Sequence, residues 1–176
     1  MDKVSYLIDV LEQAIPNLNT QILSNNLPKT EKQEDVLDWL YQSLSSQRLM
    51  DYVEWTEYFG EYPDIGLLDT LSLSESPNEF ILAELSGVDW NTVNIDPYML
   101  PYELPYLEHI NTFLTEEGLR LVDLADFENA YILCVRNDEE IIKKLNEALN
   151  TVDMGINARP PMNRKDTESY IRSLIV

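Results

Sequence analysis

The clearest hydrophobic pattern in the chain is the run at residues 129–135, which carries no charge and is rich in aromatic and β-branched side chains. Such a run is typical of a strand buried on both faces. Residues 119–122 precede it across a polar connection at 123–128, and this spacing predicts a β-hairpin. Helical periodicity predicts a helix on each side of the hairpin, at 105–115 and 138–149. The C-terminal half is therefore predicted to form a helix–strand–strand–helix unit.

The N-terminal part of the chain spaces its apolar residues mainly with helical periodicity. The pattern predicts a helix at 2–15 and a short helix at 17–26. A third helix is predicted after Thr30, whose hydroxyl would cap it and form a capping box with Gln33. These helices are expected to pack on a small sheet that contains the hairpin.

Capping residues mark three further helix starts. Ser76 predicts a helix that Gly87 ends, although the apolar run at 80–85 also fits a buried strand. Asn137 is expected to cap the helix at 138–149, and Asp166 to cap a last short helix.

Residues 48–62 combine two side-chain types at helical spacing and are predicted to form a helix with two ridges. The acidic ridge consists of Asp51, Glu54, Glu57 and Glu61, and the aromatic ridge of Tyr52, Trp55, Phe59 and Tyr62. The ordinary interpretation is that the aromatic side chains face the core and the acids face water. The functional interpretation is an interaction surface with aromatic anchors and acids that select a basic partner.

A Pro-Tyr pair occurs three times at intervals of four, at residues 97–98, 101–102 and 105–106. Internal prolines exclude a regular helix or a central strand before Pro105, so 93–104 is predicted to be an ordered crossing without helix. Two interpretations stay open: a rigid strap packed over the core, or a tyrosine-lined groove that binds a peptide.

These elements predict an α+β fold in one domain, residues 1–176, with a mainly antiparallel sheet. A helical part to about residue 87 is followed by the crossing at 93–104, the helix–hairpin–helix unit at 105–149 and a C-terminal extension at 150–176. No apolar run approaches the roughly 18 residues that span a bilayer. The start of the chain has no basic region or apolar signal core, and the chain has one cysteine, so the sequence indicates a cytoplasmic protein.

The net charge is −20 and is unevenly distributed. Residues 1–118 contain 22 acidic and 4 basic side chains, whereas 119–176 contain 10 and 8. Such a field repels nucleic acid and anionic membranes and speeds association with basic proteins. Solubility alone is an equally good explanation of an acidic surface. The basic residues near the C-terminus, Arg159, Arg164 and Lys165, are expected to pair with the chain's own acids.

No motif in the sequence carries catalytic chemistry. Cys134 lies within an apolar strand and His109 on a helix, so a cysteine–histidine dyad is not expected. The acids of the hairpin connection, Asp123, Asp126 and Glu128, are weak candidates for a hard cation, because the spacing of a calcium loop is missing. No cofactor is expected.

The stretch 88–149 resembles an uncharacterised bacterial family, a domain of unknown function. The resemblance rests on Val88-Asp89-Trp90, on a helix that ends at Gly118, and on segments 119–123 and 131–136. Such a family implies no activity. The size and acidity of the chain also resemble small bacterial immunity proteins, which implies a toxin as partner.

The sequence therefore predicts a non-enzymatic acidic protein that captures a basic protein, as an immunity protein or inhibitor captures a nuclease toxin. Its predicted contact residues are the acids and aromatic residues of 51–58 and two repeat tyrosines: Asp51, Tyr52, Glu54, Trp55, Glu57, Tyr58, Tyr98 and Tyr102. Two alternatives stay open. One is a metal-dependent hydrolase or ligand-binding enzyme that uses clustered carboxylates, and the other is a structural subunit whose charge only maintains solubility.

Overall fold

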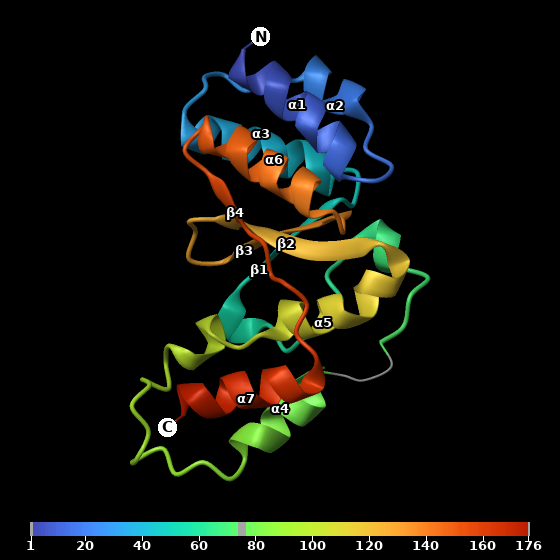
Figure 1. Ribbon diagram of the computed structural model, residues 1–176. Helices are drawn as coiled ribbons and strands as arrows, with labels where there is room; N and C mark the ends of the chain where they lie inside the picture. The colour runs from blue at the N-terminus through green and yellow to red at the C-terminus, as the bar shows by residue number, and fades with distance from the viewer. Residues whose placement is uncertain (1, 74–76, 176) are drawn as a thin grey trace.

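A four-stranded antiparallel sheet forms the middle layer of the computed structural model, which describes residues 2–73 and 77–175 (Figure 1). Its strands are β1 (Met50–Val53), β2 (Leu119–Ala125), β3 (Ala130–Arg136) and β4 (Gly155–Asn157), in the order β1-β3-β2-β4. The predicted hairpin is confirmed as the β2–β3 pair, with Leu121 opposite Cys134. These elements confirm the α+β class.

Helices cover both faces of the sheet (Figure 1). One face carries α1 (Lys3–Ala14), α2 (Thr20–Asn25), α3 (Gln33–Ser45) and α6 (Glu139–Asn150). On the other face lie α4 (Pro77–Leu85), α5 (Tyr106–Leu114) and α7 (Arg164–Leu174), with short 3-10 segments η1 (Trp55–Glu57), η2 (Gly66–Leu68), η3 (Leu100–Tyr102) and η4 (Thr115–Glu117). Within residues 2–73 and 77–175, no helix has both the length and the apolar character needed to cross a membrane.

The two central strands are buried on both faces, because their side chains alternate between two cores. Leu133 and Val135 of β3 join the core under α1, α3 and α6. Ile132 and Cys134 join the core against α5, and all four side chains are at most 1% exposed. This alternation explains why the run at 129–135 needs no polar face.

Three predicted helix caps are wrong by one to three residues. The third helix begins at Gln33 rather than directly after Thr30, whose hydroxyl instead accepts a hydrogen bond from the Lys32 N–H. Asp138 caps α6, because the side chain of Asn137 accepts a hydrogen bond from Arg120. Asn163 caps α7, and Asp166 lies in its first turn. The predicted cap at Ser76 lies outside the described residues.

The predicted helix at 48–62 is wrong. Residues 50–53 form edge strand β1, which pairs with β3 and places Tyr52 opposite Tyr131. Only 55–57 are helical, as η1. Gly60 then takes a φ of +86°, and a Cβ there would lie 2.8 Å from the Tyr106 ring, so this turn needs a glycine. Pairing with a buried strand outweighs the local helical spacing, and the two predicted ridges do not exist.

The Pro-Tyr crossing contains no α-helix, as predicted, and only the single turn η3. The three tyrosines of the Pro-Tyr repeat differ in exposure. Tyr98 is 86% exposed, Tyr102 is half-buried, and Tyr106 is buried with its ring in edge contact with Tyr58 at 5.5 Å. The crossing is therefore open to solvent at Tyr98, and the buried tyrosine of the repeat, Tyr106, belongs to the first turn of α5.

Candidate functional site

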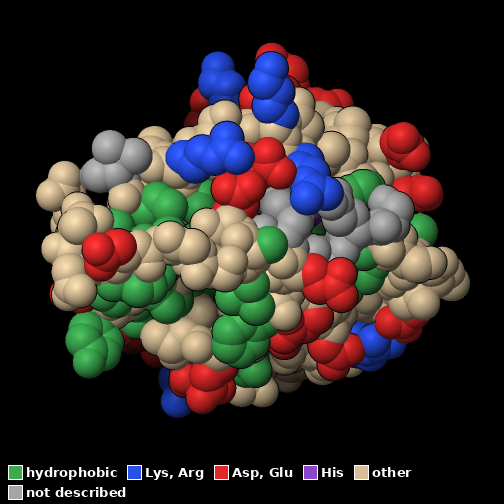
Figure 2. All heavy atoms as spheres, turned by 90° about the horizontal axis from the view of Figure 1, so that it is seen from below, with side chains coloured by type: hydrophobic (Ala, Val, Ile, Leu, Met, Phe, Trp, Pro, Cys, Tyr) green, Lys and Arg blue, Asp and Glu red, His purple; other side chains and the backbone are tan. Residues whose placement is uncertain are grey.

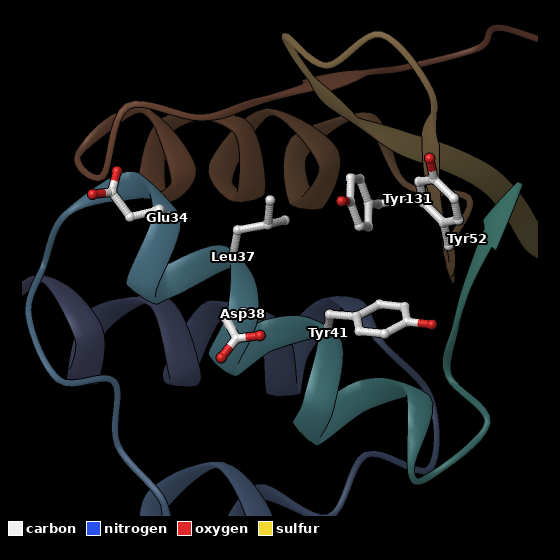
Figure 3. A pocket seen from close by; sticks show the side chains of 6 residues that line it. All are labelled: Glu34, Leu37, Asp38, Tyr41, Tyr52 and Tyr131. Carbon is white, nitrogen blue, oxygen red and sulfur yellow. The ribbon is translucent and has the colours of Figure 1, made fainter. Parts of the chain in front are cut away.

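Two hollows meet at Tyr52 on the exposed edge strand β1. The first, of about 410 Å³, lies between α3 and the β1–β3 pair (Figure 3). It is lined by Glu34, Leu37, Asp38, Tyr41, Tyr52 and Tyr131. The second, of about 320 Å³, lies along β1 and η1 and is lined by Tyr52, Val53, Glu54, Glu57, Tyr58 and Glu61. We call these two sets of residues together the β1 surface.

One face of α3 supplies four residues to the first hollow. Glu34, Leu37, Asp38 and Tyr41 follow one another at helical spacing, and Figure 3 shows Glu34 at one end of the row, the ring of Tyr41 at the other, and Leu37 and Asp38 between them. The buried stripe of α3, including Val36 and Leu40, faces the core instead. The helix therefore separates a core stripe from a hollow lined by acidic and aromatic side chains.

Tyr131 of β3 is the centre of an aromatic group at the other end of this hollow. Its ring centroid lies 5.0 Å from that of Tyr52 and 6.0 Å from that of Tyr41, and it also contacts Phe127 at 5.4 Å. Partial burial, followed by the nearby Tyr52 and Tyr41 hydroxyls, raises the pKa of Tyr131. The Tyr131 hydroxyl therefore stays neutral at physiological pH.

The second hollow owes its shape to the turn after η1. The Tyr58 hydroxyl donates a hydrogen bond of 2.5 Å to the carbonyl of Glu61, and the Glu61 carboxylate accepts one from the Phe59 N–H. Burial, and then the charge of Glu61, raises the pKa of Tyr58 well above its usual value. The exposed carboxylates of Glu54 and Glu57 complete the rim.

Four of the eight predicted contact residues, Tyr52, Glu54, Glu57 and Tyr58, line this second hollow. Asp51 lies beside them, where its carboxylate accepts a hydrogen bond from the Asp64 N–H. A strand and a turn bring these five residues together, in place of the predicted helix, and their role as partner contacts stays a prediction.

The other three predicted contacts lie elsewhere. Trp55 is only 6% exposed, so its assignment as an exposed anchor is wrong. Tyr98 lines neither hollow. Tyr102 belongs to η3, which contacts η1, and its hydroxyl lies 3.5 Å from the Glu128 carboxylate. Sequence reasoning missed Glu34, Asp38 and Tyr131 as site residues. The α3 spacing of acids beside Tyr41 was the available signal for the first two.

Arg159 occupies an internal ionic cluster that also contains one of the weak metal candidates. Its guanidinium donates to the carboxylate of Asp123 at 2.7 Å and to Glu108 at 3.1 Å. Burial lowers the pKa of Arg159, but the hydrogen bonds and charges of the two acids outweigh this effect and raise it. Burial raises the pKa of Glu108, and the opposing effect of Arg159 does not cancel that rise. The cluster is thus held together at neutral pH by the permanently charged arginine.

The three acids that the sequence places together in the hairpin connection, Asp123, Asp126 and Glu128, do not share one environment. Asp123 lies in β2 and is 2% exposed, because the strand continues to Ala125, three residues beyond the predicted end. Asp126 and Glu128 are exposed in the connection. Among the described residues, no group of three or more histidine, cysteine or acidic side chains is placed to hold a metal ion. The expected pairing of basic residues with internal acids is confirmed for Arg159 and for Arg164, which contacts Glu168 at 2.9 Å.

Cys134 is fully buried in β3, and burial raises the pKa of its thiol to about 12. The reactive thiolate form is therefore scarcely populated at neutral pH. His109 is also buried, and its ring packs edge-on against Phe113 at 5.2 Å. Both side chains are part of the protein interior.

No protein-family model, curated protein or solved structure matches the chain. The resemblances to an uncharacterised family and to immunity proteins therefore stay predictions.

Proposed function

We propose that this chain is a non-enzymatic binding protein that captures a basic protein partner with its β1 surface. The observation that carries the proposal is the meeting of two acidic, tyrosine-lined hollows at an exposed edge strand. Five carboxylates (Glu34, Asp38, Glu54, Glu57 and Glu61) and four tyrosines (Tyr41, Tyr52, Tyr58 and Tyr131) line them.

The charges of these five acids are available to a partner. In the part of the chain that the structure describes, none of them forms an ion pair with lysine or arginine, in contrast to Asp64, Asp69, Asp123 and Glu168. Carboxylates of one sign on one surface accelerate the approach of a cationic protein. Tyr41, Tyr52 and Tyr131 are at least partly exposed and supply apolar area with few rotatable bonds, which favours tight packing in an interface. Tyr58 is only 4% exposed, so it shapes the second hollow but offers little area to a partner.

The end of the molecule that contains α4 and α7 has a different character. Figure 2, seen from below, shows Lys and Arg side chains among Asp and Glu side chains, with hydrophobic side chains exposed beside them. Arg172 contacts Glu84 there at 3.3 Å, joining α7 to α4. A mixture of both signs gives little selection for a basic partner, so charge favours the β1 surface as the docking site.

Immunity or inhibitor proteins that bind nucleases provide the type of function that fits best. Their partners are basic because they bind nucleic acid, so an acidic surface competes for the same positive groups. A toxin-like reading frame next to the gene is the genomic observation that would support this type.

The test compares three baits in affinity capture from the native cell extract at low salt, with elution by a salt gradient. They are the wild type, a β1 variant with changes in both hollows (Asp38→Asn, Glu54→Gln and Glu57→Gln), and a control variant (Glu12→Gln, Glu140→Gln and Glu147→Gln). The control loses the same charge from exposed positions on α1 and α6, outside both hollows. Any protein captured is then purified and tested for direct binding.

We expect a basic protein that the wild type and the control retain equally and the β1 variant releases at lower salt. Equal retention by all three baits would show that the β1 surface is not the docking site. Equal weakening in both variants would show that only the total charge matters, as in a protein whose acids serve solubility alone.

A further inference from the structure

We infer that the first hollow takes an arginine side chain of the basic partner, with its guanidinium held between tyrosine rings and the Glu34 and Asp38 carboxylates. This inference rests on the proposed function and names the group that the partner inserts. We call the six lining residues, Glu34, Leu37, Asp38, Tyr41, Tyr52 and Tyr131, the arginine pocket.

The aromatic end of the pocket offers ring surface to a planar cation. Tyr52 and Tyr131 are tilted by 54° to each other, and Tyr41 meets Tyr131 at 81°. Three rings in different orientations therefore border one space, as Figure 3 shows. A guanidinium stacks on such rings and is attracted by their quadrupoles.

The other end of the pocket supplies the opposite charge. Glu34 and Asp38 lie one turn apart on α3 and are both exposed. Neither pairs with a lysine or arginine of residues 2–73 or 77–175. Leu37 lies between Glu34 and the ring of Tyr131, where it can contact the methylene groups of a long side chain (Figure 3).

The same features select against other ligands. Two carboxylates repel phosphate and acidic peptides. Lysine carries a compact, strongly hydrated charge, whereas the guanidinium of arginine is more weakly hydrated and presents a flat face together with donors for carboxylates. The protein already contains this type of contact inside, where Arg159 lies over Trp55 and is bonded to Asp123.

The test is an NMR titration of the ¹⁵N-labelled full chain with three capped tripeptides. The probes are acetyl-Gly-Arg-Gly-amide, its citrulline analogue, which keeps the shape but lacks the charge, and its lysine analogue. We expect the arginine peptide to shift the amide signals of residues 37–41, 52 and 131, and the citrulline peptide to bind about fivefold or more weakly. The lysine peptide should bind at an intermediate level.

Two variants locate the binding. Asp38→Asn and Tyr41→Leu should each weaken binding of the arginine peptide about three- to fivefold. Glu147→Gln, which removes an exposed acid of α6 outside both hollows, is the matched control and should leave binding unchanged. The amide spectrum of each variant also shows whether it remains folded.

Equal binding of the citrulline and arginine peptides would overturn the inference. Shifts confined to Val53, Glu57 and Glu61 would also overturn it and leave the proposed function standing, because the second hollow would then be the cationic site. If capture fails to depend on the β1 surface while the arginine peptide still binds here, the pocket is real and the proposed function fails.

Discussion

The guanidinium carbon of Arg159 lies 5.2 Å from the centroid of the Trp55 ring. The tryptophan that the sequence suggested as an anchor for a foreign cation is therefore already in contact with a cation of its own chain. The backbone of Arg159 has a φ of +47°, an uncommon conformation for a residue with a side chain. Its carbonyl accepts a hydrogen bond from the buried Asn111, so side chain and backbone together fix the C-terminal segment to α5 and β2.

Replacing Arg159 with methionine should lower the free energy of unfolding by about 3–5 kcal/mol, because Asp123 and Glu108 are left buried without a counter-charge. Urea denaturation at pH 7 measures the loss. Arg48→Met is the matched control. Arg48 also bonds two acids, Asp64 and Asp69, but its side chain is 48% exposed and its ion pairs are screened by water, so the loss should be much smaller than for Arg159→Met.

A second variant distinguishes charge from packing at this cluster. Adding Asp123→Asn and Glu108→Gln to Arg159→Met removes the uncompensated charges and should recover at least about half of the loss. No recovery would mean that Arg159 acts mainly through its packing on Trp55.

Because the pKa of Glu108 is raised, the difference in unfolding free energy between the wild type and Glu108→Gln should depend on pH. A carboxyl whose pKa is higher in the folded than in the unfolded state binds its proton more tightly when folded, so it destabilises the fold as pH rises. The stability of Glu108→Gln relative to the wild type should therefore increase from about pH 4.5 until Glu108 is ionised in the folded protein. Urea denaturation between pH 4 and pH 8 tests this. A relative stability that falls with pH would show that the Arg159 ion pair dominates.

Three glycine-to-alanine variants should form a graded series. Gly60→Ala should be the most destabilising, because its φ is +86° and the new Cβ would lie 2.7 Å from Pro77 and 2.8 Å from Tyr106. Gly118→Ala should lower the free energy of unfolding by about 1–2 kcal/mol, because a residue with a side chain is strained at a φ of +69° although the new Cβ meets no other atom. Gly87→Ala meets open space and should change stability least. Thermal unfolding gives the order, and a loss at Gly60 no larger than at Gly118 would contradict the close packing of this turn.

The local sequence pattern predicted those helices and strands whose residues interact mainly with one another or with the next element along the chain. The hairpin was predictable because β2 and β3 are adjacent in sequence, and α1 because its caps and apolar stripe lie within one segment. Strand β1 was not predictable in this way, because its four residues are stabilised by pairing with β3, which lies about eighty residues later in the chain. The periodicity of charged and aromatic residues there was compatible with a helix, but the tertiary contact decided the outcome.

The candidate site was predictable only in part for the same reason. Glu54, Glu57 and Tyr58 are close in sequence, so any folded arrangement keeps them near one another. The first hollow lies between α3 and Tyr131 of β3, and no pattern within either segment predicts that the two lie side by side. Trp55 shows the opposite error, because this residue between exposed acids belongs to the core against α5, where it contacts Tyr58 and Arg159.

The most direct test of the account is the association rate constant of the purified basic partner, measured by stopped flow at several salt concentrations. With the wild type, the rate should fall steeply as salt rises, since electrostatic steering is screened. At low salt, Asp38→Asn/Glu54→Gln/Glu57→Gln should associate about tenfold more slowly, and Glu12→Gln/Glu140→Gln/Glu147→Gln should match the wild type within about twofold. A rate that is independent of salt, or that falls equally in both variants, would contradict the proposal that the β1 surface captures the partner.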